Sequence, residues 1–233
     1  MNDIETIENN KNNFLPGQGS NSQEAAQRLQ DIGSSILRAA RDELYLGMRF
    51  LDVALSSFIY QMDGSVSPFG TDGAVMYFHP AQLGGLYKEN RILVNRGYLH
   101  MVFHCIFRHF GKPGIEKRLW NLSCDIAVEH MIDGIYHRSV RYSRSLLRRE
   151  TYRLLEKEKK TLNAERIYKI LKEEFLKEKE LAQLEKEFYV DDHKYWANQQ
   201  PDRKPNPLMS KKWGDISEGI ETDLGTFSRE AGA

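Results

Sequence analysis

The sequence has no excess of charge of either sign: its 233 residues include 33 lysines and arginines and 33 aspartates and glutamates. A neutral chain has no overall field that would attract nucleic acid or an anionic membrane, so any electrostatic preference must be local. Long apolar runs are also missing, since no stretch approaches the roughly 18 uncharged apolar residues of a membrane-spanning helix. The N-terminus lacks the basic and apolar regions of a signal peptide. Nothing therefore indicates secretion or membrane insertion.

Cysteine is scarce as well. Cys105 and Cys124 both lie in apolar helical surroundings, and two thiols are too few for a disulfide framework. This usage predicts a reducing, cytoplasmic location. The sequence also contains no P-loop, no G-x-G-x-x-G motif and no nucleophile elbow.

Composition divides the chain into three segments. Residues 1–20 are rich in Asn, Gly and Ser and are predicted to be a disordered leader. Residues 21–136 are predicted to form an α+β, mostly helical domain, and residues 137–233 a charged helical extension and linker. Because the last residues carry no helix cap or folded ending, we expect the extension to lead toward a missing C-terminal domain.

The domain begins with a predicted amphipathic helix. Asn21 would be its N-cap and Glu24, three residues later, completes a variant of the capping box. Apolar positions then recur with helical period to about residue 43, and a second helical stretch is expected over residues 44–55.

Strand-like runs flanking two Asp-Gly turn signals predict a small antiparallel sheet between residues 58 and 78. Residues 92–110 are apolar nearly all round, which predicts a central, buried helix. A further helix is expected over residues 115–135. Beyond it, charged residues make up more than half of residues 148–187, but an apolar stripe persists and predicts an exposed helix docked by one face. A short helix is expected over residues 213–224.

The segment Leu99-His100-Met101-Val102-Phe103-His104 places two histidines one helical turn apart in the most apolar part of the chain. Both rings of such a pair point the same way, and their nitrogens can approach one zinc ion to about 2.0 to 2.1 Å. This is the spacing of the zinc motif H-E-x-x-H, although Met101 replaces the glutamate. Unpartnered imidazoles are costly to bury, so His100 and His104 need partners.

Two carboxylates one turn apart follow on the next predicted helix. Asp125 lies about 20 residues after His104, where some zinc peptidases carry a third ligand, and Glu129 could brace a ligand histidine through its Nδ1–H. The alternative is a satisfied buried polar cluster without metal, in which the carboxylates pair with the histidines or with Arg118. Two imidazoles and one carboxylate also describe a non-haem iron site, but two ligands from a single helical turn favour zinc.

These motifs resemble a known family, the metallopeptidase domain at the N-terminus of bacterial proteins that carry a C-terminal von Willebrand factor A-like domain. The resemblance covers roughly residues 35–135 and rests on Thr71-Asp72-Gly73, the histidine segment with Arg108-His109, and Trp120 through Asp125. It implies a zincin-like core of helices on a small sheet, with His100 and His104 as zinc ligands and Asp125 as the third ligand. It also implies two partners, the von Willebrand factor A-like domain of the same protein and a MoxR-type ATPase.

Met101 affects whether the domain can act as a peptidase. A thioether cannot take a proton from water near neutral pH, and loss of a general base costs about 10²- to 10⁴-fold in rate. The sequence therefore favours a degenerate metallopeptidase domain that binds zinc and acts as a binding or assembly module, with no catalytic residue assigned. Two alternatives stay open: an active zinc hydrolase that uses another base, such as Glu129, and an arginine-mediated nucleic-acid binder. Met101 is also an ordinary core residue by type.

Three other features contain side chains that could bind a ligand or a partner. His109 is interpreted as a surface or capping residue near a helix end. Asp191, Asp192 and His193, with Trp196 after them, either brace a loop or approach the metal from outside. The six arginines between residues 138 and 153 could contact phosphates, but a solvated helix or a docking face for an acidic partner is the preferred interpretation.

Overall fold

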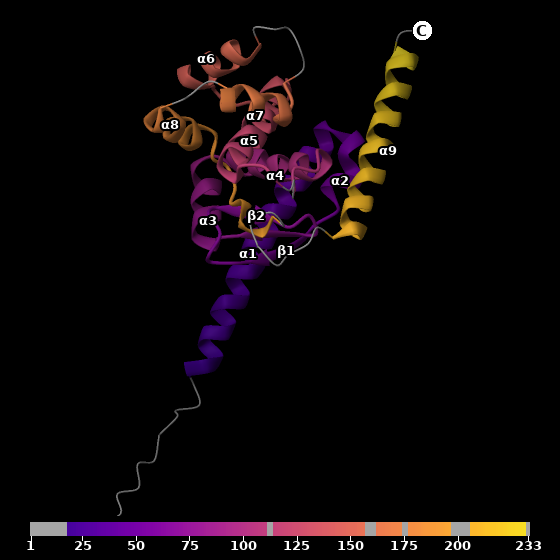
Figure 1. Cartoon of the computed structure of the whole chain (residues 1–233). Coiled ribbons are helices and arrows are strands. Elements are labelled where there is room, and N and C mark those ends of the chain that lie inside the picture. The colour runs from indigo at the N-terminus through magenta and orange to yellow at the C-terminus, as the bar shows by residue number, and fades with distance from the viewer. Residues whose placement is uncertain (1–17, 111–113, 157–161, 174–176, 197–205, 232–233) are drawn as a thin grey trace, which may run out of the picture.

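A computed structural model describes residues 18–110, 114–156, 162–173, 177–196 and 206–231. The fold is α+β and mostly helical, as predicted, and Figure 1 shows its arrangement. Its helices are α1 (Gln18–Gly47), η1 (Arg49–Leu51), α2 (Asp52–Leu55), α3 (Pro80–Glu89), α4 (Arg91–Ile106), α5 (Lys117–Gly134), α6 (Leu146–Leu155), α7 (Ala164–Glu173), α8 (Glu178–Phe188), η3 (His193–Tyr195) and α9 (Pro207–Ala231). Its strands are β1 (Ile59–Met62), β2 (Phe69–Thr71) and β3 (Val75–Phe78). Among the described residues, no helix has both the length and the apolar character needed to cross a membrane.

The first helix is longer than predicted. α1 starts at Gln18, so Asn21 lies inside the helix and is not its N-cap, and α1 continues to Gly47 without a break near residue 43. The predicted leader falls mostly on residues 1–17, which lie outside the described residues. Figure 1 shows the N-terminal half of α1 extending beyond the rest of the fold.

The sheet is mixed, so the prediction of an antiparallel sheet was only half right. β2 and β3 form the antiparallel pair, joined by a turn in which Gly73 adopts a φ of 90°. β1 pairs with β3 in parallel, with Ile59 opposite Val75. In the strand order β1-β3-β2, β3 lies between the other two strands. The chain reverses at the turn after β2, so β3 runs antiparallel to β2 and parallel to β1.

α4 is the buried centre of the molecule, as its apolar surface predicts, although it ends at Ile106 and not near residue 110. Asn90 caps its start by accepting a hydrogen bond from the Ile92 amide. α4 lies against α1, α3 and β2 on one side and against α5 and α9 on others. Every residue from Val94 to Ile106 is buried, so polar side chains in this stretch are held in the interior.

The charged extension folds back onto the domain. Its apolar stripe is buried, but it is divided among α6, α7 and α8, so the predicted exposed helix is at least three helices within the described residues. α7 packs along α5, and together the extension and α5 enclose a second apolar core. α9 is longer than the predicted stretch and packs on α4, where the Trp213 indole donates a hydrogen bond to the Gly73 carbonyl.

Gly97 lets α4 approach the sheet closely, and this contact yields a prediction. A Cβ at residue 97 would lie 2.4 Å from Cε2 of the buried Phe69 ring. We expect Gly97→Ala to destabilise the protein by about 1 to 3 kcal/mol, because overpacking outweighs the gain in helix propensity of about 1 kcal/mol. Gly84→Ala in α3 is the control, since a Cβ there meets nothing within 4 Å. Denaturant unfolding measures both, and equal stability of the two variants would contradict this account of the contact.

Candidate metal centre

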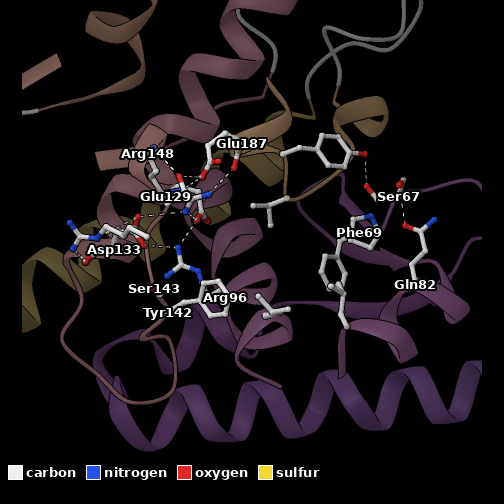
Figure 2. Close-up of a pocket in the computed structure, with 17 residues that line it drawn as sticks. Ser67, Phe69, Gln82, Arg96, Glu129, Asp133, Tyr142, Ser143, Arg148 and Glu187 are labelled. Carbon is white, nitrogen blue, oxygen red and sulfur yellow. Dashed lines mark hydrogen bonds and ion pairs between the residues drawn. The ribbon is translucent and has the colours of Figure 1, made fainter. Parts of the chain in front are cut away.

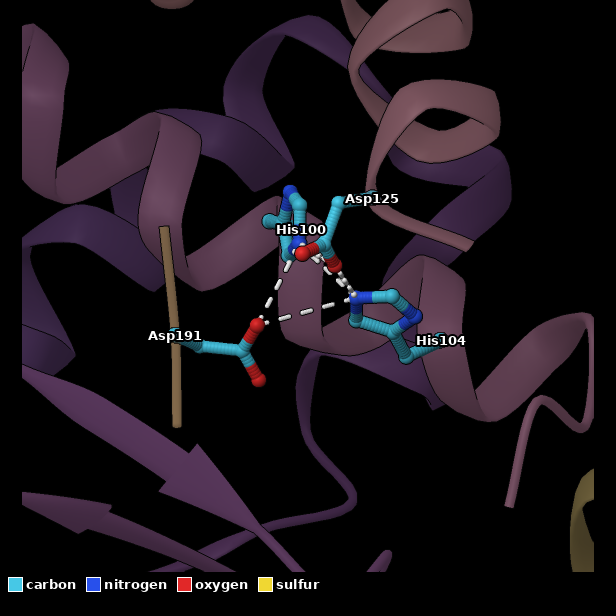
Figure 3. Close-up of side chains that lie close together, drawn as sticks. All are labelled: His100, His104, Asp125 and Asp191. Atoms are coloured by element: carbon cyan, nitrogen blue, oxygen red, sulfur yellow. Dashed lines mark hydrogen bonds and ion pairs between the residues drawn. The ribbon is translucent and has the colours of Figure 1, made fainter. Parts of the chain in front are cut away.

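α4 presents two imidazoles to the same point in the interior. The Nε2 atoms of His100 and His104 lie 2.7 Å apart, and both side chains are fully buried. The spacing of one helical turn predicts that both rings face one side of the helix, and Figure 3 shows them converging.

Two carboxylates from different parts of the chain complete the cluster (Figure 3). Asp125 on α5 places Oδ1 at 3.5 Å from Nε2 of His100 and 3.3 Å from Nε2 of His104. Asp191, which follows α8, places its Oδ1 at 3.3 and 3.7 Å from the same two nitrogens. One ligand atom from each of the four residues lies within 4.8 Å of all the others, and all four residues are buried.

These distances fit a tetrahedral metal ion. Ligand atoms at about 2.0 to 2.1 Å from a zinc ion lie about 3.3 Å from one another at the corners of a tetrahedron. The four nitrogen-to-oxygen separations run from 3.3 to 3.7 Å, and the two nitrogens are closer together. The two imidazoles and two carboxylates therefore form a donor set that could hold a metal ion.

The polar atoms of the cluster also lack other partners. Oδ1 of Asp125 and both carboxylate oxygens of Asp191 are buried and accept no hydrogen bond from any described residue. Arg118, which could have paired with these carboxylates, instead binds Glu178 and Glu185. Buried carboxylate oxygens without hydrogen bonds are costly, and this favours a bound cation over the metal-free alternative.

His193 stands at the outer side of the cluster. Its Nε2 lies 3.1 Å from Oδ1 of Asp125 and 3.0 Å from Oδ1 of Asp191, without the alignment of a hydrogen bond. Its ring stacks on the buried Trp196, with ring centroids 3.9 Å apart. Burial alone would lower its pKa, but the two carboxylates raise it to about 10. A cavity of about 340 Å³ opens here and is lined by Asp125, Asp191 and His193 among others.

The other nitrogen of each α4 histidine has a defined partner. Nδ1 of His100 lies 2.9 Å from Oε1 of Glu129, which is where a bracing carboxylate was expected. Nδ1 of His104 lies 2.9 Å from Nδ1 of His109. His109 is 4% exposed, so its assignment to the surface was wrong: the backbone turns after Ile106 and brings the ring back inside.

The electrostatic surroundings of the two α4 histidines differ. Burial by itself lowers the pKa of His100, but Asp125, Asp191 and Glu129 outweigh it and raise that pKa well above its usual value. Burial and the neighbouring His100 lower the pKa of His104 to about 4. Burial and His104 likewise hold the pKa of His109 well below its usual value, so that ring is neutral and can accept a hydrogen bond.

Glu129 faces away from the cluster of ligand atoms. Its Oε1 is directed at Nδ1 of His100, on the opposite side of the ring from Nε2. Burial would raise the pKa of Glu129, but His100, Arg96 and Arg148 together hold it well below its usual value. This position argues against the alternative in which Glu129 replaces the missing general base. Met101 is fully buried and belongs to the apolar core around the sheet.

The arginine-rich stretch is not simply a solvated face. The Arg148 side chain is 13% exposed, and its Nη1 lies 2.5 Å from Oε2 of Glu129. Arg144 donates to the backbone carbonyl of Asp133. Arg138, Arg141 and Arg149 remain exposed, so the preferred interpretation holds for these arginines and fails for Arg148.

The structure thus brings together His100, His104 and Asp125, adds Glu129 behind His100, and leaves Met101 in the core. Sequence reasoning left Asp191 open, either bracing a loop or approaching the metal, and it missed His109 as a partner of His104. The run Asp191-Asp192-His193 was noted for its chemistry, but no spacing rule connects it to the α4 histidines.

The chain matches a known protein family. The sequence of residues 34–228 matches a protein family described as "Putative metallopeptidase domain". The match extends well beyond residues 35–135, over which the resemblance was recognised, and it includes Asp191. No curated protein and no solved structure matches the chain.

Proposed function

The chain belongs to this metallopeptidase-domain family, and we propose that it binds one zinc ion through His100, His104, Asp125 and Asp191 without acting as a peptidase. Structural zinc sites are closed by four protein ligands, whereas catalytic sites keep one position for water or substrate. The observation that carries the proposal is Asp191, a fully buried carboxylate whose oxygens have no hydrogen-bond partner in the described part of the chain and whose Oδ1 faces the two histidines.

The position of Met101 supports the absence of catalysis. In H-E-x-x-H sites the glutamate takes a proton from metal-bound water, and Met101 offers no proton acceptor. Zinc bound here would neutralise two buried carboxylates and join α4, α5 and the segment after α8. Its chemistry would be that of a structural cross-link, and the residues that hold it would fix the extension against the domain.

We further propose that the metal-stabilised domain is a binding or assembly module. The partners suggested by the family resemblance are a C-terminal von Willebrand factor A-like domain in the same protein and a MoxR-type ATPase.

Metal analysis of protein purified without chelator tests the proposal. We expect about one equivalent of zinc in the wild type, in line with one four-ligand site, and less than about a tenth of an equivalent in His104→Ala. His130→Ala is the matched control, because His130 lies on the outer face of α5 and pairs with Glu156. Wild-type protein with no metal, or His104→Ala with full metal, would refute the proposed site.

An active hydrolase is the second candidate, and one observation favours it. The cavity of about 340 Å³ is lined by Asp125, Asp191 and His193, and a substrate would have to enter through it. In that case Asp191 would not be a permanent ligand. Metal-dependent cleavage of an unfolded protein substrate by wild type, lost in His100→Ala, would favour this candidate over the closed site.

A further inference from the structure

Two buried arginines stand behind the metal centre, on the side of Glu129 away from the ligand atoms. Arg96 on α4 and Arg148 on α6 each place a guanidinium nitrogen 2.5 Å from Oε2 of Glu129. Their side chains are 7% and 13% exposed, and that of Glu129 is 1% exposed. Figure 2 shows this group in the wall of a cavity of about 690 Å³.

The two oxygens of Glu129 bind different partners. Oε2 accepts from both arginines, which leaves Oε1 to face Nδ1 of His100 at 2.9 Å. A carboxylate can only accept hydrogen bonds, so Nδ1 of His100 must donate. In the neutral ring the other nitrogen, Nε2, then carries its lone pair toward the cluster, and this is the tautomer that a metal ligand needs.

The arginines are themselves fixed by the surrounding structure. Asp133 lies 2.8 Å from Arg96 and 3.5 Å from Arg148, and the Tyr152 hydroxyl donates to the same carboxylate. Arg148 also donates to the side chain and the backbone carbonyl of Glu187 at the end of α8. The guanidinium of Arg148 therefore has little freedom to turn away from Glu129.

Charge balance explains why two arginines are needed. A buried carboxylate without a cation would be strongly disfavoured, and a single partner would leave the charge of Asp133 uncompensated. Arg96, Arg148, Glu129 and Asp133 form a neutral set of two cations and two anions. His104 has no such support, because its Nδ1 faces the neutral His109.

We propose that Arg148, together with Arg96, is a positioning residue of the metal centre that acts through Glu129 to orient His100 and select its tautomer. The inference rests on the proposed metal site and adds a second link between the extension and the centre. Asp191 reaches the metal from one side, and Arg148 supports a ligand from the other. A buried salt bridge with only a general stabilising role would leave metal affinity unchanged in folded protein.

The test compares zinc affinity in Arg148→Met and Arg118→Met, measured by competition with a chromophoric chelator. Arg118 serves as the control because it pairs with two glutamates on α8, makes no contact with Glu129, and is 40% exposed. We expect Arg148→Met to weaken zinc binding about 10- to 100-fold, the usual cost of losing an outer partner of a metal ligand. Arg118→Met should leave the affinity within about twofold, because exposed ion pairs contribute little.

A double-mutant cycle with Glu129→Gln tests whether Arg148 affects zinc affinity through Glu129. If Arg148 acts through Glu129, Arg148→Met should have little further effect in the Glu129→Gln background. The ¹⁵N shifts of the His100 ring give a second readout, since loss of the fixed tautomer changes them. If Arg148→Met does not fold, Arg148→Lys serves instead, because it keeps the charge but loses the planar fork.

The possible failures can be told apart. Wild-type protein that binds no zinc would refute the metal site and this inference with it. Wild-type protein that binds zinc, with Arg148 variants no weaker than Arg118→Met or with fully additive effects of Arg148 and Glu129 substitutions, would refute the positioning role alone.

Discussion

Removing the metal with a chelator is expected to lower the melting temperature of the protein by about 8 to 16 °C. A ligand that binds only the folded state at a thousandfold excess over its dissociation constant stabilises that state by about 4 kcal/mol. For a chain of this size, each kcal/mol shifts the melting temperature by about 2 to 4 °C. Calorimetric scans with zinc and with chelator measure the difference.

The structural reason for this effect is the pair of carboxylates in the cluster. Asp125 and Asp191 are both buried, and their Oδ1 atoms converge without hydrogen bonds from the described residues. Without a divalent cation, the imidazoles of His100 and His193 would be left to offset their mutual repulsion. Chelation should therefore loosen the segment after α8 first, and Trp196, which is fully buried against His193, should report this through its fluorescence.

Two controls make this expectation specific. The tryptophan signal should disappear in Trp196→Phe, which separates it from the signals of Trp120 and Trp213. His104→Ala should melt at the same temperature with zinc and with chelator, because it no longer holds the metal. Identical melting of wild type under the two conditions would mean that the cluster is stable without a cation.

Local sequence patterns predicted the elements around the centre well. The apolar stretch that contains His100 does form a buried helix, and Asp125 and Glu129 do lie on the facing helix, four residues apart. Helical periodicity reports which side chains share a face, and this was sufficient for three members of the cluster. Sheet direction was harder, because two strands joined by a turn say nothing about where the third strand inserts.

Asp191 and Arg148 could not have been placed from the sequence. Each reaches the centre through the packing of α6, α7 and α8 on α5, which depends on contacts between residues far apart in the chain. Composition marked this region as highly charged, which is typical of solvated helices. Its buried charged residues are exceptions that become apparent only when the partners of Glu129 and the α4 histidines are known.

Asp191→Ala is expected to weaken zinc binding by more than the about 10- to 100-fold that loss of an outer partner costs, because it removes a direct ligand. Asp192→Ala is the matched control one residue away. The Asp192 side chain accepts a hydrogen bond from the Lys194 amide and takes no part in the cluster. Its loss removes a cap of η3 but no ligand atom, so zinc affinity should stay unchanged within about twofold.

The same variant decides whether the site is closed. With cobalt in place of zinc, azide should change the visible spectrum of Asp191→Ala, since three protein ligands leave one position open, and should not change that of wild type or Asp192→Ala. Equal azide binding by wild type would indicate an open, catalytic-type site and favour the hydrolase. Opening the site should still not produce a peptidase, because Met101 cannot supply the proton transfer that contributes about 10²- to 10⁴-fold to the rate. Metal-dependent proteolysis by Asp191→Ala would show instead that Asp191 was the barrier and that another residue serves as the base.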